Sequence, residues 1–249
     1  MTAVLARRAL AEGLGTALLV TAVIGSGIAA ARLSPDDTGL QLLENSLATG
    51  AALVALILAL QPISSAFNPV VTLVERALGA LTTREAALLV LVQLVGGVLG
   101  AVLANLMFDL PAVDIATTSR TGAGIWYAET VATAGLVLVI FGSVRSGRSD
   151  TVAYAVGGYI TAAYWFTSST SFANPAVTTA RMLSDTFAGI APGSVPAFLL
   201  LQLLGGALGL VLVVLLYPEV ADIAGGPTDL DDRNLPSAED QPNSRPMEN

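Results

Sequence analysis

The chain has 249 residues, of which 54% are hydrophobic and 12% charged, with a mean hydropathy of +0.72 and a formal net charge of −8. A water-soluble domain of this size has too little interior to hide so much apolar surface, so the composition favours a protein that crosses a membrane several times. All 11 basic residues are Arg, and Cys and His do not occur. This composition excludes thiolate chemistry, histidine-based metal sites and lysine Schiff bases. We therefore expect neither an enzyme nor a cofactor or metal site. Residues 219–249 supply −6 of the net charge of −8, so the rest of the chain is nearly neutral and no nucleic-acid partner is expected.

Long stretches with few or no charges predict six membrane spans, because a bilayer core of about 30 Å takes about 20 helical residues. The spans lie near residues 9–31, 40–60, 84–107, 125–143, 151–167 and 195–217. A cleaved signal peptide is an alternative interpretation of the first span, since Arg7 and Arg8 precede an apolar stretch that ends in small residues. Glu12 interrupts that stretch and argues against this alternative.

Two Asn-Pro dipeptides, Asn68-Pro69 and Asn174-Pro175, each begin a helix-type sequence inside an uncharged stretch of thirty residues. Asn is a preferred cap for a helix N-terminus, and Pro at the first helical position loses no hydrogen bond. Thirty residues are too many for one span and too few for two, and the segments 68–78 and 174–184 would form helices of roughly 16 Å. We predict two half-helices that enter the membrane without crossing it.

The order Glu, Asn-Pro, Gln-x-x-Gly-Gly occurs twice in the chain. Glu12 and Gln93 flank the first Asn-Pro segment, and Glu129 and Gln202 flank the second. Each half contains three spans, an odd number, so the second half must enter the membrane upside down. The sequence therefore predicts an inverted repeat in a membrane domain over residues 1–218, with one copy at about 9–107 and the other at about 125–217.

The arginines predict the orientation of this domain. If the N-terminus is cytoplasmic, six arginines of residues 1–218 lie on the cytoplasmic side and three on the outer side. Cytoplasmic loops carry an excess of basic residues, so both termini are expected in the cytoplasm. The segment 219–249 contains eight acidic residues and two Arg, and we interpret it as a disordered cytoplasmic tail.

At this point the chain resembles the aquaporin and glycerol-facilitator family (major intrinsic proteins), from about Leu10 to Tyr217. The motifs are Ala11-Glu12-x-x-Gly15-Thr16, the two Asn-Pro-x-x-Thr segments and the paired Gln-x-x-Gly-Gly elements. The resemblance implies an all-α membrane protein of six transmembrane helices and two half-helices that meet at the midplane, and a homotetramer. It assigns six residues to the middle of the pore: Asn68, Pro69, Val70, Asn174, Pro175 and Ala176. An Asn cap there can accept a backbone N–H with its oxygen and donate from its NH₂ into the lumen.

The narrow outer filter of the family is where this chain departs from the pattern. The resemblance places the filter at Thr49 or Ala48, Ala162, Ser171 and Val177, where the family often has an aromatic residue, His and Arg. These side chains are small or apolar, so we expect a wider and uncharged constriction. Arg181 lies one turn beyond Val177, and we favour a solvated arginine at a helix end over a residue of the outer vestibule. Ala66 stands where the family usually has His, two residues before Asn68.

The expected function is a passive channel for small uncharged solutes, namely water, glycerol-type polyols and neutral metalloid hydroxides such as arsenous acid. The chain looks most like bacterial members associated with arsenic resistance, which implies a multi-pass protein of the bacterial inner membrane whose partners are small neutral solutes, water and the lipid bilayer. Three alternatives remain: a water-selective aquaporin, a proton-coupled transporter that uses Glu12 and Glu129, and a structural membrane protein with a vestigial pore. Intramembrane acids are functional candidates by default, but matching positions in both halves favour structural support for the loops before the half-helices.

Overall fold

The structure is a computed structural model that describes residues 2–218, within which all regular structure is helical. The expected acidic tail at 219–249 lies outside the described residues. Eight α-helices occur in the described part: α1 (Ala3–Leu33), α2 (Thr38–Leu60), α3 (Pro69–Ala77), α4 (Thr83–Met107), α5 (Ala123–Arg145), α6 (Val152–Phe166), α7 (Pro175–Ala180) and α8 (Val195–Leu216). Three short 3₁₀ turns, η1 (Ser149–Thr151), η2 (Arg181–Leu183) and η3 (Pro192–Ser194), adjoin α6, α7 and α8.

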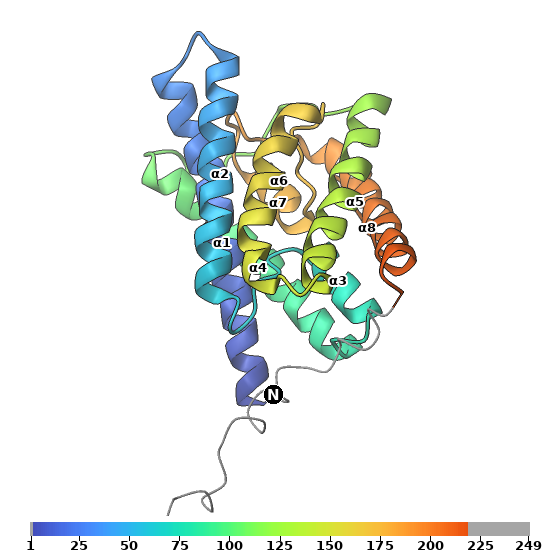
Figure 1. The fold of residues 1–249 in the computed structure, drawn as a ribbon. Coiled ribbons are helices and arrows are strands. Elements are labelled where there is room, and N and C mark those ends of the chain that lie inside the picture. Colours follow the sequence, from blue (N-terminus) through green and yellow to red (C-terminus); the bar gives the residue numbers. More distant parts are fainter. Residues whose placement is uncertain (1, 219–249) are drawn as a thin grey trace, which may run out of the picture.

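Six of these helices correspond to the six expected spans. Within residues 2–218, α1, α2, α4, α5 and α8 are long and apolar enough to cross a bilayer. The helix α6 has 15 residues, which at 1.5 Å each makes it about 22 Å long, less than the hydrocarbon thickness. In Figure 1, α1 and α6 rise from the side where the N-terminus lies, whereas α2 and α5 descend toward it. The predicted fold class, with six long helices and two half-helices, is confirmed.

Two helix pairs, α1 with α4 and α5 with α8, form the most extensive helix contacts within residues 2–218. Each pair approaches through a glycine of a Gly-Gly motif. A Cβ atom at Gly96 would overlap the carbonyl oxygen of Gly13, and one at Gly205 would overlap that of Thr130. The equivalence of the two contacts agrees with an inverted repeat, and small residues at a helix crossing let membrane helices approach closely. The helix α1 is thus a full part of the fold, which removes the signal-peptide alternative.

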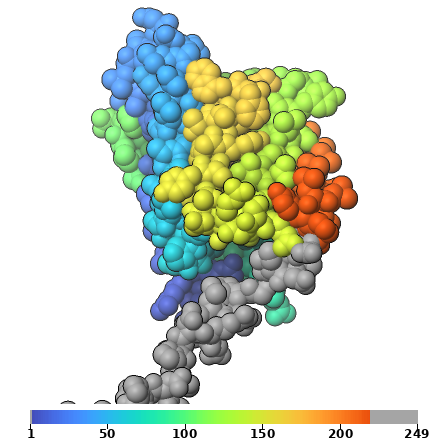
Figure 2. All heavy atoms as spheres, in the orientation of Figure 1, coloured from blue at the N-terminus to red at the C-terminus, as the bar shows by residue number. Residues whose placement is uncertain are grey.

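The half-helices α3 and α7 begin near each other at the centre of the molecule and run in opposite directions (Figure 1). Each has Asn as its N-cap and Pro as its first residue, as the sequence predicts. Both pack against α4 and α8. The helices α2 and α6 lie side by side, and α6 lies in front of α7 in the view of Figures 1 and 2. The long helices therefore enclose two helix N-termini in the interior.

The loop before α3 is held by a buried glutamate of α1. The carboxylate of Glu12 accepts hydrogen bonds from the backbone N–H groups of Ala66 and Phe67, at 2.8 and 2.7 Å, and from the hydroxyl of Ser64. Its Oε2 also accepts from Gln93 Nε2 of α4 at 2.8 Å. Hydrogen bonds to a carboxylate are roughly twice as strong as neutral ones, so Glu12 fixes the conformation of the irregular chain that leads into α3.

Glu129 of α5 holds the loop before α7 in the same way. Its two oxygens accept from the N–H groups of Phe172 and Ala173, both at 2.9 Å, and from Gln202 Nε2 of α8 at 2.6 Å. Ala173 and its counterpart Phe67 both have φ of 46°, a left-handed conformation that costs a non-glycine residue about 1–2 kcal/mol. The paired carboxylates stabilise this unfavourable backbone, in agreement with the structural role expected for the two glutamates.

Candidate pore

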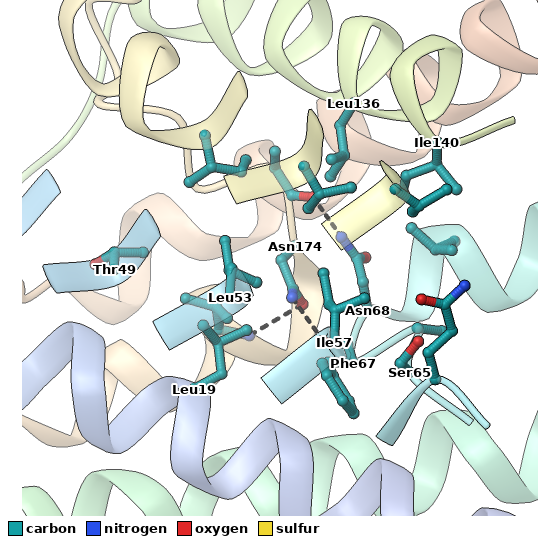
Figure 3. Close-up of a pocket in the computed structure, with 18 of the residues that line it drawn as sticks. Leu19, Thr49, Leu53, Ile57, Ser65, Phe67, Asn68, Leu136, Ile140 and Asn174 are labelled. Atoms are coloured by element: carbon teal, nitrogen blue, oxygen red, sulfur yellow. Dashed lines mark hydrogen bonds between the residues drawn. The ribbon is translucent and has the colours of Figure 1, made fainter. Parts of the chain in front are cut away.

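The side chains of Asn68 and Asn174 lie next to each other at the ends of the two half-helices (Figure 3). Asn68 Oδ1 accepts the N–H of Val70, and its Nδ2 donates to the carbonyl of Ala173 in the other half at 2.8 Å. Asn174 Oδ1 caps α7, and its Nδ2 donates to the carbonyl of Phe67, also at 2.8 Å. Each NH₂ group thereby fastens one half of the chain to the other. Each also retains a second hydrogen, which has no hydrogen-bond partner among residues 2–218.

A cavity of about 290 Å³ passes both asparagines. One water molecule needs only ~10–15 Å³ of such cavity space, so the cavity has room for a row of small molecules. Its wall is built from helix faces on which mostly apolar residues recur at every fourth position, because residues i and i+4 lie on the same side of a helix. These residues are Thr49, Leu53 and Ile57 of α2, Leu136, Ile140 and Val144 of α5, and Val152, Val156, Ile160 and Tyr164 of α6.

The end of the cavity nearest the N-terminus, here called the inner end, carries polar and charged groups. It is lined by Arg8, Gln61, Ser64, Ser65 and Glu75. Ala66 also lines the cavity, at the position where the sequence departs from the usual His of the family. A methyl group takes little space there, so this mouth is open around the backbone of the loop.

The opposite end, here called the outer end, is lined by Thr49, Tyr164, Ser171, Val177 and Arg181. The hydroxyl groups of Thr49 and Tyr164 form a hydrogen bond of 3.2 Å that joins α2 to α6. The hydroxyl of Ser171 is buried and has no hydrogen-bond partner among the described residues. A buried polar atom without a partner is uncommon and calls for a physical explanation.

Three of the expected filter residues line the cavity, and two do not. Thr49, Ser171 and Val177 contact it, whereas Ala48 and Ala162 are absent from its wall. Ala162 is exposed on the outer surface of the molecule, so its assignment to the filter is corrected. The reason is helical phase: Ala162 lies two residues from Ile160, about 200° around the helix axis. Tyr164, on the same face as Ile160, is the residue of α6 that lines the outer end.

The other four residues that the resemblance assigns to the middle of the pore pack against neighbouring helices or begin the half-helices. Pro69 and Pro175 are the first residues of α3 and α7, and neither lines the cavity. Val70 packs against Gly206 of α8, and Ala176 approaches Gly97 of α4. The glycines that follow the two glutamines therefore let the half-helices lie against the long helices.

Arg181 overturns the expectation of an uncharged outer end. It is only 2% exposed, lines the cavity and stacks on Phe172 with its guanidinium carbon 3.4 Å from the ring centroid. Arg120, in the loop between α4 and α5, lies 5.2 Å from the same ring. Burial lowers the pKa of the Arg120 guanidinium from its ordinary value. The one-turn spacing from Val177 allowed a position in the outer vestibule, but the sequence could not decide for it, because the position of Arg181 depends on how the chain after α7 folds back.

The comparisons with known proteins agree with this architecture. The family model described as Major intrinsic protein matches residues 1–153. The chain is 51% identical over 210 residues to "Aquaglyceroporin AqpS" of Rhizobium meliloti (strain 1021), covering 84% of this chain and 89% of that protein.

Among solved structures, the chain is similar to the X-ray structure of the aquaglyceroporin from Plasmodium falciparum, with a TM-score of 0.66 and 20% identity. The match covers 88% of this chain and 99% of the other, and at this identity it shows the fold alone. The match to the family model and the 51% identity to the Rhizobium protein show the family as well as the fold. The chain belongs to the major intrinsic protein family, whose members are membrane channels and not enzymes.

Proposed function

We propose that this protein is a passive channel for water and small uncharged hydroxyl solutes, including glycerol-type polyols and neutral metalloid hydroxides such as arsenous acid. The observation that carries the proposal is the cavity with a largely aliphatic wall and two asparagine amides at its centre. An apolar wall makes solutes give up hydration, and fixed donors replace part of it for a neutral hydroxyl group but not for a cation. The similarity to a protein named an aquaglyceroporin supports the same class of solute.

The residues proposed for the pore fall into two groups. Asn68 and Asn174 donate to the oxygen of a passing solute with the free hydrogen of each NH₂ group. Thr49, Ser171 and Val177, which all line the cavity, set the width of its outer end. A filter with Val177 in the position of the usual arginine admits solutes wider than water, which favours a glycerol-type channel over a water-selective one.

The position of the two glutamates argues against proton-coupled transport. Glu12 and Glu129 are fully buried, and neither lines the cavity. Every hydrogen bond that the two carboxylates accept comes from the loops, from Gln93 or from Gln202. A proton carrier needs contact with the solute or with water, and these carboxylates have a structural task instead.

We further propose a bacterial inner-membrane protein with both termini in the cytoplasm, in which residues 1–218 form the channel domain and four copies assemble into a homotetramer within the lipid bilayer. The apolar helices support the membrane location, and the excess of arginine on the N-terminal side supports the orientation. The tetramer rests on membership of the family alone.

The function is tested by stopped-flow light scattering of liposomes that contain the purified protein, with water, glycerol and arsenous acid in turn. We expect each flux to exceed that of protein-free liposomes. Ile57→Trp places a bulky ring into the cavity and should reduce all fluxes severalfold or more. Leu58→Trp is the matched control, because Leu58 is 44% exposed on the outside of the same helix, and it should conduct like the parent. Equal flux through both variants would refute a pathway through this cavity.

A further inference from the structure

We propose that Arg181 is the residue of the outer end that repels cations, and that Phe172 positions it for this role. The inference rests on the proposed channel function and adds a specificity-determining residue to it. The position that faces the outer end in α7 is Val177, which carries no charge. Arg181 lies one helical turn further along the chain, in η2, and its side chain returns to the same cavity.

The first argument is the pair of contacts that hold the guanidinium. Its Nε donates a short hydrogen bond to the carbonyl of Ala188, and its plane lies over the ring of Phe172. A cation over the face of an aromatic ring is attracted by the ring quadrupole, and more strongly when the pair is desolvated. The ring is itself fixed, since it packs edge to face against Phe198 of α8 at 5.0 Å. The charge therefore has a defined place.

The second argument is that two nitrogen atoms of the guanidinium have no hydrogen-bond partner among the described residues. Nη1 and Nη2 of Arg181 make no hydrogen bond within residues 2–218. They are not sealed inside the protein, because the fully enclosed polar atoms that lack a partner belong to other residues. They are therefore open to the cavity that Arg181 lines. No carboxylate of the described residues forms an ion pair with this arginine, so no direct ion pair neutralises its positive charge. Such a charge at low dielectric acts strongly on a passing ion.

The third argument comes from Arg120, the second arginine near Phe172. Its Nε and Nη2 donate to the carbonyls of Gly189 and Phe187, and it does not line the cavity. The loop that follows η2 thus supplies carbonyls to both arginines, but only Arg181 presents free donors to the pathway. The two guanidinium groups differ in function although they share one ring.

The experiment compares Arg181→Gln with Arg32→Gln in liposomes that contain the full chain and a pH-sensitive dye. Arg32 is a matched control, since it also lies over a ring, that of Phe108 at 5.2 Å, and also donates to a carbonyl, yet it is exposed and away from the cavity. Under a potassium diffusion potential, we expect the proton leak of Arg181→Gln to rise on the order of tenfold or more, because a nearby unit charge shifts an ion's energy by more than thermal energy. Arg32→Gln should leak like the parent.

Glycerol flux, recorded on the same vesicles, separates the two levels of the proposal. If the parent moves glycerol and Arg181→Gln shows the parent's leak, the assignment of Arg181 is overturned and the channel stands. If the parent moves no solute above protein-free vesicles, the channel function itself is wrong. Should Arg181→Gln fail to fold, Phe172→Leu keeps the charge but removes its platform, and a folded Phe172→Leu with unchanged leak overturns the proposal as well.

Discussion

Asn68 and Asn174 each form hydrogen bonds with both the oxygen and the nitrogen of the side-chain amide. The oxygen caps the half-helix that the residue begins, while the nitrogen donates to the carbonyl before the other half-helix. Asp or Ser could cap a helix as well, but neither has an NH₂ group that bridges to the opposite half and still has a hydrogen to spare. The chemistry of the residue type therefore explains why both positions carry Asn.

Which residues line the outer end was predicted only in part. Ser171 and Val177 were named from the family resemblance, which places filter residues three positions before and three positions after the second Asn, and both line the cavity. Tyr164 was missed because the sequence does not say which face of α6 lines the cavity. Once Val152, Val156 and Ile160 are known to line it, their spacing of four residues leads to Tyr164. For Arg181 the sequence left two interpretations, and the favoured one, a solvated arginine, was wrong, because the contact of its side chain with the carbonyl of Ala188 forms only after the chain turns back.

At the residue scale, Val177→Arg tests the width of the outer end. Val177 lines the cavity one turn before Arg181, so a second guanidinium would fill the constriction and repel the first. We expect glycerol flux to fall about tenfold or more, which corresponds to a barrier higher by roughly 1.4 kcal/mol, while water flux falls much less. Stopped-flow scattering on the same vesicles measures both rates.

Val177→Leu separates bulk from charge in this experiment. It adds one methylene group without a charge, and we expect a modest decrease of glycerol flux. If Val177→Arg carries glycerol at the rate of the parent, the side chain at this position does not set the width of the pathway.

At the element scale, the half-helices were the most predictable part of the fold. Their Asn-Pro starts, their shortness and their place inside uncharged stretches follow from local chemistry and from the bilayer thickness. The ends of the long helices were less predictable: α1 begins at Ala3, six residues before the expected span. Apolarity marks the part of a helix that lipid surrounds, whereas a helix can continue into water on either side.

Gly96→Ala tests the packing of α1 against α4. The added methyl group would overlap the carbonyl oxygen of Gly13, so the helices must separate, and overpacking of this kind costs typically 1–3 kcal/mol. We expect the midpoint of thermal unfolding of the purified protein in detergent to fall by several degrees, at about 2–4 °C per kcal/mol for a chain of this size.

Gly158→Ala is the control for this prediction. Gly158 lies in α6, and a Cβ atom there would have no neighbour within 4 Å. Alanine is the better helix former by about 1 kcal/mol, so this variant should unfold at the same or a higher temperature. A midpoint for Gly96→Ala that matches that of Gly158→Ala would contradict the close helix crossing.

At the scale of the whole molecule, the two halves contain the same internal hydrogen bonds, and the two asparagine amides join one half to the other. Glutamate, glutamine and threonine form a buried chain of hydrogen bonds in each half, through Gln93 to Thr72 and through Gln202 to Thr178. The asparagine bridges then join the halves across the cavity. These contacts leave the half-helices fixed to both halves, whereas transporters of inverted-repeat design move one part against another around a fixed site.

A rigid pathway of this kind predicts flux that equalises concentrations and never exceeds them. In vesicles with an inward proton gradient, internal glycerol should rise to the external concentration and stop there, and the initial rate should be the same with and without the gradient. Radiolabelled glycerol trapped by rapid filtration measures both quantities. Accumulation above the external concentration that disappears in Glu129→Gln would mean that the buried carboxylates couple proton movement to transport, and it would require the half-helices to move. The hydrogen bonds from Phe172, Ala173 and Gln202 that hold Glu129 in place are the physical reason to expect the opposite result.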